Sequence, residues 1–415
     1  NGNVYIPHVY GMNSPKTVTK SPENTWTNNW VEFEHNNHDT TTIQITRKND
    51  QIWPSNTHIR PLSYNIPLKL MDNNKTVSFT VSNNILHTFS VHYGDTNSYP
   101  YQNNSALFDS MLVFITPETI NITANLKNPK IYKPGYYNLT DGGYPPGSGV
   151  FSVNNSMNSD ITSIIVQRGA WINGKFNIDI PNVNVYGPGI MSGQYFDYDK
   201  RKDSNSWNNN INDITTHGKS VSIIGITMIT PNWRFWDDIN EYGTMQYFRG
   251  FGWQPNNGLG GIRSNTYVSN CFVRTYDDII KQKGYNITSN NMVFWQGNNG
   301  GTFQLGWSGY EANNEILNQN WDIIETEFHC PNELVTSGHC RNDAIFDAMD
   351  PSNATWNGPF IFKNINIDGD VRNFMMLGLN ETSILSNMIF ENVNISGQIT
   401  VLTGMYTNSN TSKIS

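Results

Sequence analysis

Charged residues are scarce in this sequence, since only 14% of its 415 positions are Asp, Glu, Lys or Arg. The formal net charge is −8, and no cluster of Lys and Arg occurs. Binding a phosphate backbone requires such clusters, so a nucleic-acid partner is excluded. No run of about 18 apolar residues is present either, which excludes a helix that spans a membrane. The acidic residues form no compact set typical of calcium sites, and we expect neither a metal nor a cofactor.

Cysteine is rare as well, with three residues in the chain. The segment "HCPNELVTSGHC" places Cys330 and Cys340 close enough to predict a disulfide that closes one surface loop. A zinc site is the alternative, because His329 and His339 stand next to these cysteines and complete a set of four ligands. Cys271 lies in an apolar strand pattern, where we expect a small buried side chain rather than a reactive thiol.

Asn, Thr, Ser and Gly supply most of the polarity, which favours many short strands and tight turns over long helices. The chain starts at Asn1 without an initiator Met, as expected after removal of a signal peptide or trimming of the sequence. Ten Asn-x-Ser/Thr sequons predict a secreted, extracellular glycoprotein. These sequons are at Asn74, Asn103, Asn121, Asn138, Asn154, Asn286, Asn353, Asn380, Asn394 and Asn410.

The first part of the chain alternates between apolar and polar side chains, as in "NWVEFEH", "TTIQITRK", "TVSFTVS" and "HTFSVHYG". Clusters of Asn, Asp, Pro and Gly separate these segments, a pattern typical of an antiparallel β-sandwich. The passage "LKNPKIYKPGYYNLTDGGYPPGSG" is rich in Pro and Gly and marks the start of a new unit. We predict a sandwich over residues 1–125, a linker and entry segment over 126–147, and a second domain over 148–415.

Short apolar strands recur in the second domain, and several carry an Asn or Gly at the same place relative to the strand. Asn270 and Asn291 are 21 residues apart, and Asn364 and Asn392 are 28 apart, which is the length of one coil of a parallel β-helix. A buried Asn in each coil can hydrogen-bond to its equivalents above and below. A second sandwich or a β-propeller is the alternative, because no strict repeat length is visible.

Two adjacent acids, Asp277 and Asp278, interrupt a strand pattern in "FVRTYDDIIKQKGYNITSNN". At a strand end, a bend can turn both carboxylates toward one groove. Two close carboxylates raise one of their pKa values, so one can act as a general acid while the other stays ionised as a base. This is glycosidase chemistry, and in inverting enzymes the two carboxyl groups stand roughly 6.5 to 9.5 Å apart. The alternative is a turn in which one Asp caps backbone amides and the other pairs with Arg274 or Lys281.

Several segments, taken in order, resemble glycoside hydrolase family 49, the dextranase and isopullulanase group. The segments "HIRPLSYNIPL", "HTFSVHYGD" and "DSMLVFITPE" resemble its N-terminal sandwich, and "IYKPGYYNL", "GAWINGKFNI" and "GPGIMSGQYF" resemble the entry to its β-helix. "TYDDIIK" and "FQLGW" resemble its active-site coils. The resemblance implies an N-terminal antiparallel β-sandwich followed by a right-handed parallel β-helix, and inverting hydrolysis of α-glucans with α-1,6 linkages or their neighbours.

The family uses three aspartates, of which two are matched here. By position, Asp277 resembles the general acid and Asp278 resembles one of the pair that activates water. Lys281 matches a family lysine that binds a sugar hydroxyl or balances charge. Asn257 stands where the family has the Asp of a Thr-Asp-Gly segment, with a one-residue shift in spacing. An Asn cannot accept a proton, so hydrolysis is weakened or lost, although Asn257 can still orient a water.

A nearby acid can replace the missing one. Candidates are Asp237 and Asp238 in "FWDDINEYG" and Asp347 and Asp350 in "FDAMDPS", each of which also fits a loop or capping role. Aromatic residues cluster around the same coils, and sugar rings stack on such side chains. We expect Trp233 and Trp236 to lie in a loop and to bind substrate, while others fit either core or substrate roles. The cluster comprises Trp233, Trp236, Tyr247, Phe251, Trp253, Trp295 and Trp307.

Three functions remain open from the sequence. The first is a secreted inverting α-glucan hydrolase, with polysaccharide as substrate. The second is a catalytically silent protein that binds glycans through the same groove. The third is a self-assembling structural protein of a wall, coat or filament, for which a glycosylated solenoid is suited. The missing Asp supports both alternatives to the hydrolase.

Overall fold

The computed structural model describes most of the chain as β-strands. The described residues are 10–13, 27–35, 40–47, 51–82, 88–92, 110–117, 126–139, 149–193, 214–217, 219–229, 234–238, 241–252, 258–275, 277–296, 300–306, 315–324, 344–350, 355–379 and 384–405. In these ranges the one helical element is a 3-10 turn at Leu62–Tyr64. No helix in the described part is long and apolar enough to cross a membrane. Backbone contacts divide the chain into two compact units, residues 1–121 and 122–415.

The first unit is a β-sandwich. One sheet has the order β1 (Tyr10–Asn13), β2 (Thr27–His35), β8 (Ser110–Pro117), β7 (Thr88–His92) and β4 (His58–Arg60). The other has the order β3 (Thr40–Thr46), β6 (Thr76–Ser82) and β5 (Leu68–Met71). Alternating side chains of both sheets meet in one core that includes Val31, Val113, Ile43 and Phe79. The predicted N-terminal sandwich is confirmed, and its described strand pairs are antiparallel except for β2 and β8, which run parallel.

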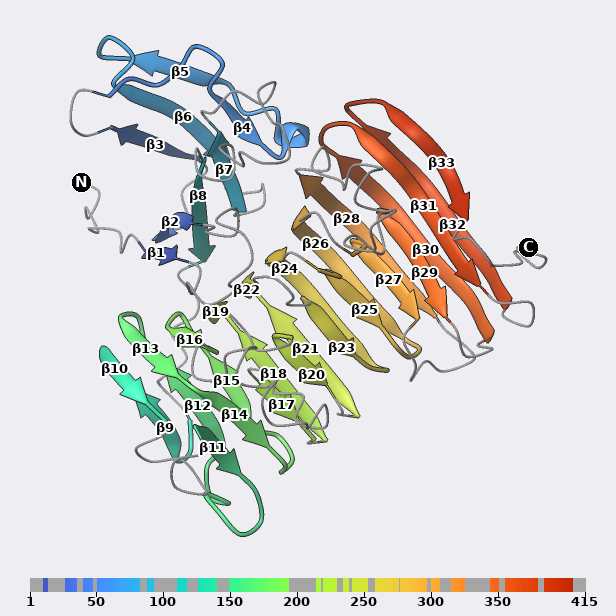
Figure 1. The fold of residues 1–415 in the computed structure, drawn as a ribbon. Coiled ribbons are helices and arrows are strands. Elements are labelled where there is room, and N and C mark those ends of the chain that lie inside the picture. Colours follow the sequence, from blue (N-terminus) through green and yellow to red (C-terminus); the bar gives the residue numbers. More distant parts are fainter. Residues whose placement is uncertain are drawn as a thin grey trace. The chain divides into compact units, whose positions relative to one another are not determined.

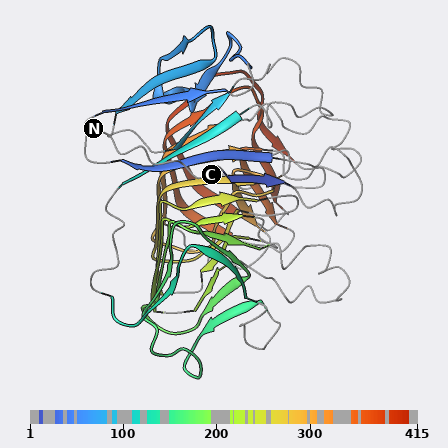
Figure 2. The ribbon, with the colours of Figure 1, turned by 90° about the vertical axis from the view of Figure 1, so that its left-hand side faces the viewer.

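The second unit is a parallel β-helix (Figures 1 and 2), in which each chain segment of two or three strands forms one coil on top of the last. The described strand pairs of this unit are parallel, which rules out the alternatives of a second sandwich or a propeller. The ten-stranded sheet of this unit carries the candidate site. Its order is β11 (Val150–Val153), β14 (Lys175–Ile178), β17 (Ile214–Thr216), β20 (Trp236–Asp238), β23 (Leu259–Ile262), β25 (Ile280–Gln282), β27 (Phe303–Gly306), β29 (Phe346–Asp350), β31 (Val371–Leu379) and β33 (Ile399–Met405).

The 15-stranded sheet begins as two rows that merge at the long strand β24 (Thr266–Thr275). One row is β9 (Pro129–Tyr132), β12 (Ser163–Val166), β15 (Asn184–Tyr186), β18 (Ser220–Ile224) and β21 (Tyr242–Gln246). The other is β10 (Gly135–Asn138), β13 (Ala170–Asn173), β16 (Ile190–Ser192), β19 (Thr227–Ile229) and β22 (Arg249–Phe251). After β24 the sheet continues with β26 (Ile287–Gln296), β28 (Ile316–Ile324), β30 (Thr355–Ile367) and β32 (Ile384–Ile395).

Asparagine side chains form a ladder where the long strands bend. Asn291 donates to Asn270 at 3.2 Å, Asn364 donates to Asn320 at 3.0 Å, and Asn392 donates to Asn364 at 2.8 Å. Their backbones are left-handed, with φ between 54° and 56°, a conformation that Asn tolerates better than most residues. The predicted pairs at spacings of 21 and 28 residues are confirmed. The ladder is half-buried or exposed, however, and not buried as we expected, because the bend turns these amides outward.

The interior of the β-helix is filled by one continuous set of apolar side chains from Tyr132 to Leu385. Cys271 belongs to it at 1% exposure, and burial raises the pKa of its thiol to about 12. The expectation of a small buried side chain in place of a reactive thiol is therefore confirmed. Rigid packing of this kind fixes the coil corners, and one of those corners carries the two adjacent acids.

Candidate active site

Asp277 and Asp278 lie at the corner between β24 and β25. The next two residues, Ile279 and Ile280, belong to the apolar interior and hold this corner in place. On one side, the Gly258 N–H donates to the backbone oxygen of Asp278 at 2.8 Å. On the other, the Ile279 N–H donates to the backbone oxygen of Gly301 at 3.0 Å. The corner is therefore fixed to both neighbouring coils.

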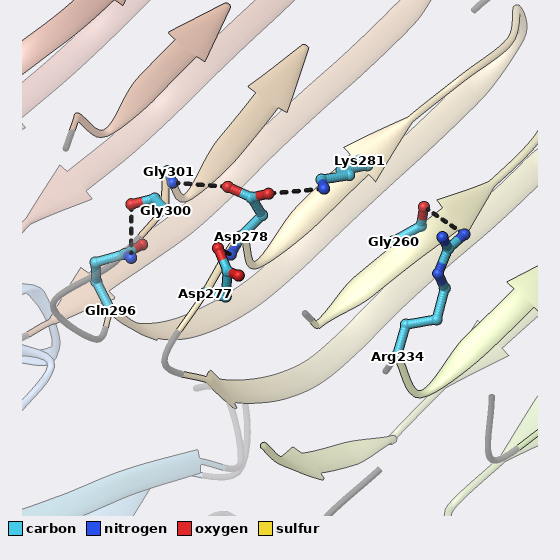
Figure 3. Close-up of polar contacts among 8 residues, drawn as sticks. All are labelled: Arg234, Gly260, Asp277, Asp278, Lys281, Gln296, Gly300 and Gly301. Carbon is cyan, nitrogen blue, oxygen red and sulfur yellow. Dashed lines mark hydrogen bonds and ion pairs between the residues drawn. The ribbon is translucent and has the colours of Figure 1, made fainter. Parts of the chain in front are cut away.

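The Asp278 carboxylate is buried, with 3% of the residue exposed. Its Oδ2 lies 2.7 Å from the Lys281 ammonium, and its Oδ1 accepts a hydrogen bond from the Gly301 N–H at 3.2 Å (Figure 3). Both contacts favour a negative charge on this carboxylate, because each places a donor against an oxygen. The structure thus contains the ion pair between one Asp and Lys281 that the alternative turn interpretation predicts. Its other suggested partner, Arg274, lies 3.9 Å over the ring of Trp295.

Asp277 is half-buried, and its Oδ1 accepts a hydrogen bond from the Asp278 N–H at 2.9 Å. The pKa of Asp277 is raised from 3.8 to about 7, mainly by burial and also by the neighbouring negative charge of Asp278. Lys281 and the Asp278 N–H oppose this rise in pKa but do not cancel it. A carboxyl group with a pKa near 7 can be protonated at neutral pH and can donate that proton.

One glycine of the next coil lets its backbone approach both acids closely. Gly300 has φ +77°, and a Cβ added to it would lie 2.4 Å from the Asp278 nitrogen and 2.7 Å from the Asp277 Oδ1. Gln296 holds this glycine, because its Nε2 donates to the Gly300 oxygen at 3.2 Å (Figure 3). Thr302 in turn donates to the Gln296 Oε1 at 2.6 Å. Gly300 therefore contributes a close backbone approach to the acid pair.

The other candidate acids lie on strands. Asp237 and Asp238 are part of β20, and Asp347 and Asp350 are part of β29, so their assignment to loops or caps is wrong. Neighbouring strands override the turn propensity of these Asp residues. Asp347 is buried at 1% exposure, and a Cβ added to Gly301 would lie 2.9 Å from its Cβ.

Gly301 contacts both acids, because its N–H donates to Asp278 and its Cα lies next to the Asp347 side chain. Asp347 is therefore a described acid close to the backbone that binds Asp278.

The expected aromatic substrate residues have mixed outcomes. Trp236 lies on β20 at 1% exposure, and its indole N–H donates to the Thr216 hydroxyl at 3.0 Å. It is a core residue, and the prediction of a loop position is wrong, because alternation along β20 turns its ring inward. Trp295 is also buried, against Arg274. Phe251 is buried and Tyr247 is half-buried.

Several predicted residues lie outside the described part of the chain. These are Asn257, Trp233, Trp253, Trp307, the zinc and disulfide candidates His329, Cys330, His339 and Cys340, and the sequons at Asn103, Asn121, Asn353, Asn380 and Asn410. Of the described sequons, Asn286 and Asn394 are exposed, whereas Asn74, Asn138 and Asn154 are half-buried. The described residues contain no group of three or more His, Cys, Asp or Glu side chains that could hold a metal.

Sequence reasoning missed Arg234, which is half-buried and donates to the Gly260 oxygen at 3.2 Å (Figure 3). Gly260 is on β23, the strand that pairs with β25 of the acid corner. The sequence offered one signal for this contact, the glycine pair of "GLGGI", which leaves room for a long side chain from the preceding coil.

These features define an all-β protein whose parallel β-helix holds a carboxylate pair at a sheet corner. No protein-family model matches the chain. Over 411 aligned residues the chain is 24% identical to the isopullulanase of Aspergillus niger, an alignment that covers 88% of this chain and 70% of that protein. Dex49A from Penicillium minioluteum has a similar structure, with a TM-score of 0.61 and 15% identity, covering 89% of this chain and 84% of that one. The resemblance to glycoside hydrolase family 49 is therefore confirmed along most of the chain.

Proposed function

We propose that this protein is a secreted glycoside hydrolase that cleaves α-glucan of the dextran or pullulan type with inversion. The observation that carries this proposal is the acid pair itself, in which Asp278 lies 2.7 Å from Lys281 while Asp277 lies beside it, where burial and the adjacent carboxylate raise its pKa to about 7. Such a pair divides into an acid and a base, which is what glycoside hydrolysis requires. The similarity to an isopullulanase supports α-glucan as the substrate class.

In this proposal Asp277 protonates the leaving glycosidic oxygen. Asp278 accepts a proton from the attacking water, and Lys281 at 2.7 Å balances its charge. Asp347, across Gly301 from Asp278, is our candidate for the second carboxylate that Asn257 does not supply. Asn257 orients the water or a sugar hydroxyl, because an amide can hydrogen-bond but cannot take up the proton.

One observation favours a second function, glycan binding without turnover. Both oxygens of Asp278 already have partners, Lys281 and the Gly301 N–H. A carboxylate held in this way has fewer oxygen lone pairs left to accept a proton from water. The loss of the Asn257 carboxylate acts in the same direction.

Reducing-sugar release from dextran and from pullulan separates the two functions. We expect release by the wild-type protein and a loss of roughly 10² to 10⁴ in turnover by Asp277→Asn, the usual contribution of a general acid. Binding of either glucan with no release after prolonged incubation at high protein concentration would support the binding function instead. No release and no binding would leave the structural alternative.

The base side of the reaction is tested by two further variants. Asn257→Asp restores the carboxylate that the family has, and turnover should rise sharply if this position faces the water. Asp347→Asn should lower turnover if Asp347 is the substitute base, and should leave it unchanged if Asp347 only supports β29. A rise in turnover with Asn257→Asp and no change with Asp347→Asn would place the water at position 257. No change with Asn257→Asp and a fall with Asp347→Asn would identify Asp347 as the base.

A further inference from the structure

A second surface of the β-helix carries exposed aromatic residues and few charged ones. Along β15, β18, β21, β24 and β26, the inward residues Val185, Ile223, Met245 and Val268 belong to the core. Their neighbours point outward, since side chains alternate along a strand. These outward residues are Asn184, Tyr186, Ser222, Ile224, Thr244, Gln246, Tyr267, Thr288 and Asn290. None of them can ionise near neutral pH. The charged residues next to them, Lys219 and Glu241, lie 4.0 Å apart and offset each other's charge, so this face is complementary to an uncharged ligand.

Tyrosines are concentrated in the middle of this face. Tyr242 is 51% exposed and Tyr267 is 39% exposed, on the adjacent strands β21 and β24. The register pairs Thr244 with Tyr267, so Tyr242 is diagonal to Tyr267. Strand spacing and rise put such diagonal positions about 8 Å apart. The two rings therefore lie within the length of a short oligosaccharide.

A third tyrosine, Tyr247, has an unusual backbone. Its φ is +52°, a conformation that is an outlier for a bulky residue. The register pairs Gln246 with Ser269 and Arg249 with Phe272, which places Tyr247 opposite Asn270, the first rung of the asparagine ladder. Tyr247 therefore has a strained backbone at a position where other coils have Asn, which adopts this left-handed conformation more readily. Strain of this kind persists at functional sites.

Tyr247 lies close to Tyr267. Burial raises the pKa of Tyr247, and the nearby Cys271 thiol and Tyr267 hydroxyl raise it further. The Gln246 amide next to it donates to the Ser269 hydroxyl at 3.1 Å. Aromatic faces, hydroxyls and planar amides are therefore gathered within two adjacent coils.

We propose that Tyr242, Tyr247 and Tyr267 form a glycan-binding platform that is separate from the acid pair. The C–H face of a sugar stacks on aromatic rings, and its hydroxyls hydrogen-bond to amides and hydroxyls such as those of Gln246 and Thr244. The ligand is a neutral polysaccharide, and the choice of an α-glucan rests on the proposed function. The platform belongs to the row that contains β21, whereas the acids sit at the entry to β25 in the ten-stranded sheet. It would keep the protein on a polymer while another segment is cleaved.

Native gel electrophoresis in gels with and without soluble dextran or pullulan tests the platform directly. We expect the polymer to retard the wild-type protein, and we expect Tyr242→Ala and Tyr267→Ala each to raise the relative dissociation constant at least threefold, and about tenfold together. Tyr136→Ala is the matched control, because Tyr136 is 66% exposed on β10 in the first coil. This control should be retarded like the wild type.

Tyr247→Asn removes the third ring without breaking the fold, because it places an Asn where the ladder already uses one. We expect an unchanged or higher melting temperature together with weaker retardation. Cleavage of a short oligosaccharide that cannot reach both surfaces should be unaffected in all platform variants. A drop in melting temperature with unchanged retardation would mean that Tyr247 has only a packing role and would contradict its place in the platform.

The outcomes for the platform and for hydrolysis are distinguishable. If the wild-type protein is retarded through these tyrosines but releases no sugar, the platform stands and the hydrolase proposal fails. If sugar is released while Tyr242→Ala and Tyr267→Ala are retarded like the wild type, the platform is wrong. A wild-type protein that neither polymer retards also overturns the platform. Asp277→Asn should be retarded normally in every case.

Discussion

Asp277 and Asp278 are adjacent in the sequence, yet their surroundings differ. Asp278 is buried against the Lys281 ammonium, whereas Asp277 is half-buried and faces the negative charge of its neighbour. The difference arises at the corner, where Asp278 lies 2.7 Å from Lys281 on β25, whereas Asp277 accepts a hydrogen bond from the Asp278 N–H. Two identical side chains thus have different surroundings in one corner, and our proposal gives them separate roles on this basis.

The pH dependence of turnover follows from the pKa of about 7 at Asp277. The general acid must be protonated, so kcat/KM should fall as pH rises through about 7. A pH–rate profile on dextran or pullulan measures this fall in kcat/KM. Asp277→Asn should show no such fall near pH 7, and its rate should be lower by roughly 10² to 10⁴. If the kcat/KM of the wild type instead falls near the ordinary carboxyl pKa, another residue is the general acid.

Stability should depend on pH through the same group. The pKa of Asp277 in the folded protein lies above its ordinary value of 3.8, so the folded state binds the extra proton and loses stability as pH rises from there to about 7. Asp277→Asn cannot ionise. Its free energy of unfolding relative to wild type should increase between pH 5 and pH 8, by on the order of 1 to 3 kcal/mol.

Urea unfolding at both pH values measures this difference. Asp160→Asn is the control, since it removes the same charge from an exposed position of the same unit. A difference between wild type and Asp277→Asn that does not change with pH would show that Asp277 has no raised pKa.

Gly300→Ala should damage the corner directly. The added Cβ would meet the Asp278 nitrogen at 2.4 Å, and φ is +77°. We expect a loss of about 2 to 4 kcal/mol in unfolding free energy, together with reduced turnover. Gly260→Ala is the matched control on the neighbouring strand, because its Cβ would first meet the flexible Arg234 side chain at 3.4 Å. Equal stability of the two variants in urea unfolding would contradict a close approach at Gly300.

The sequence reveals the doublet because charges are so rare in the chain, but it does not reveal the doublet's partners. Lys281 lies three residues away and could be proposed from spacing alone. Gly300 and Gly301 are more than twenty residues away, and their contacts depend on coil register, which apolar patterning does not define. Asp347 is still further along the chain and reaches Gly301 only because β27 and β29 are paired.

At the scale of elements, the asparagine ladder holds consecutive coils in register. Asn364 donates to Asn320 at 3.0 Å and accepts from Asn392 at 2.8 Å, with a left-handed backbone at φ 54°. Each rung satisfies amides that the bend would otherwise leave without partners. Because coils differ in length, the ladder provides a fixed point that the loops do not.

Asn364→Ala should cost about 2 to 4 kcal/mol, since it removes two hydrogen bonds and places Ala in a left-handed conformation. Asn364→Gly keeps the backbone conformation accessible and should cost about half as much. Asn392→Ala, at the end of the described ladder, should cost less than Asn364→Ala because it loses one of these bonds. Chemical unfolding of the three variants gives the order, and a reversed order would show that the ladder does not stabilise the coils.

Strand assignments near the site show the limits of local patterns. The segment "FWDDINEYG" has the composition of a turn, yet Trp236 to Asp238 form β20. This strand lies between β17 and β23, and pairing on both sides outweighs the low strand propensity of Asp. Asp347 on β29 is misassigned for the same reason. Recurring Asn and Gly positions were the more reliable guide, since they reflect contacts between coils.

At the scale of the molecule, the sequence predicts both units but not their details. Period-two alternation predicts the sandwich because each of its sheets has a face in the core, whereas the parallel β2–β8 pair depends on a long-range crossover with no local signal. The β-helix was recognisable from its repeated strands. Its coils vary in length, with ladder spacings of 21, 28 and 44 residues, and this variation hides the repeat.

The central claim is that one corner of the β-helix hydrolyses α-glucan with inversion through Asp277 and Asp278. The most direct measurement is a proton NMR time course of dextran or pullulan with the purified protein, which identifies the anomer of each new reducing end before mutarotation. We predict that the β-anomer appears first in the wild-type reaction and that Asp277→Asn gives no early signal. Initial formation of the α-anomer, or wild-type and Asp277→Asn time courses that coincide, would contradict it.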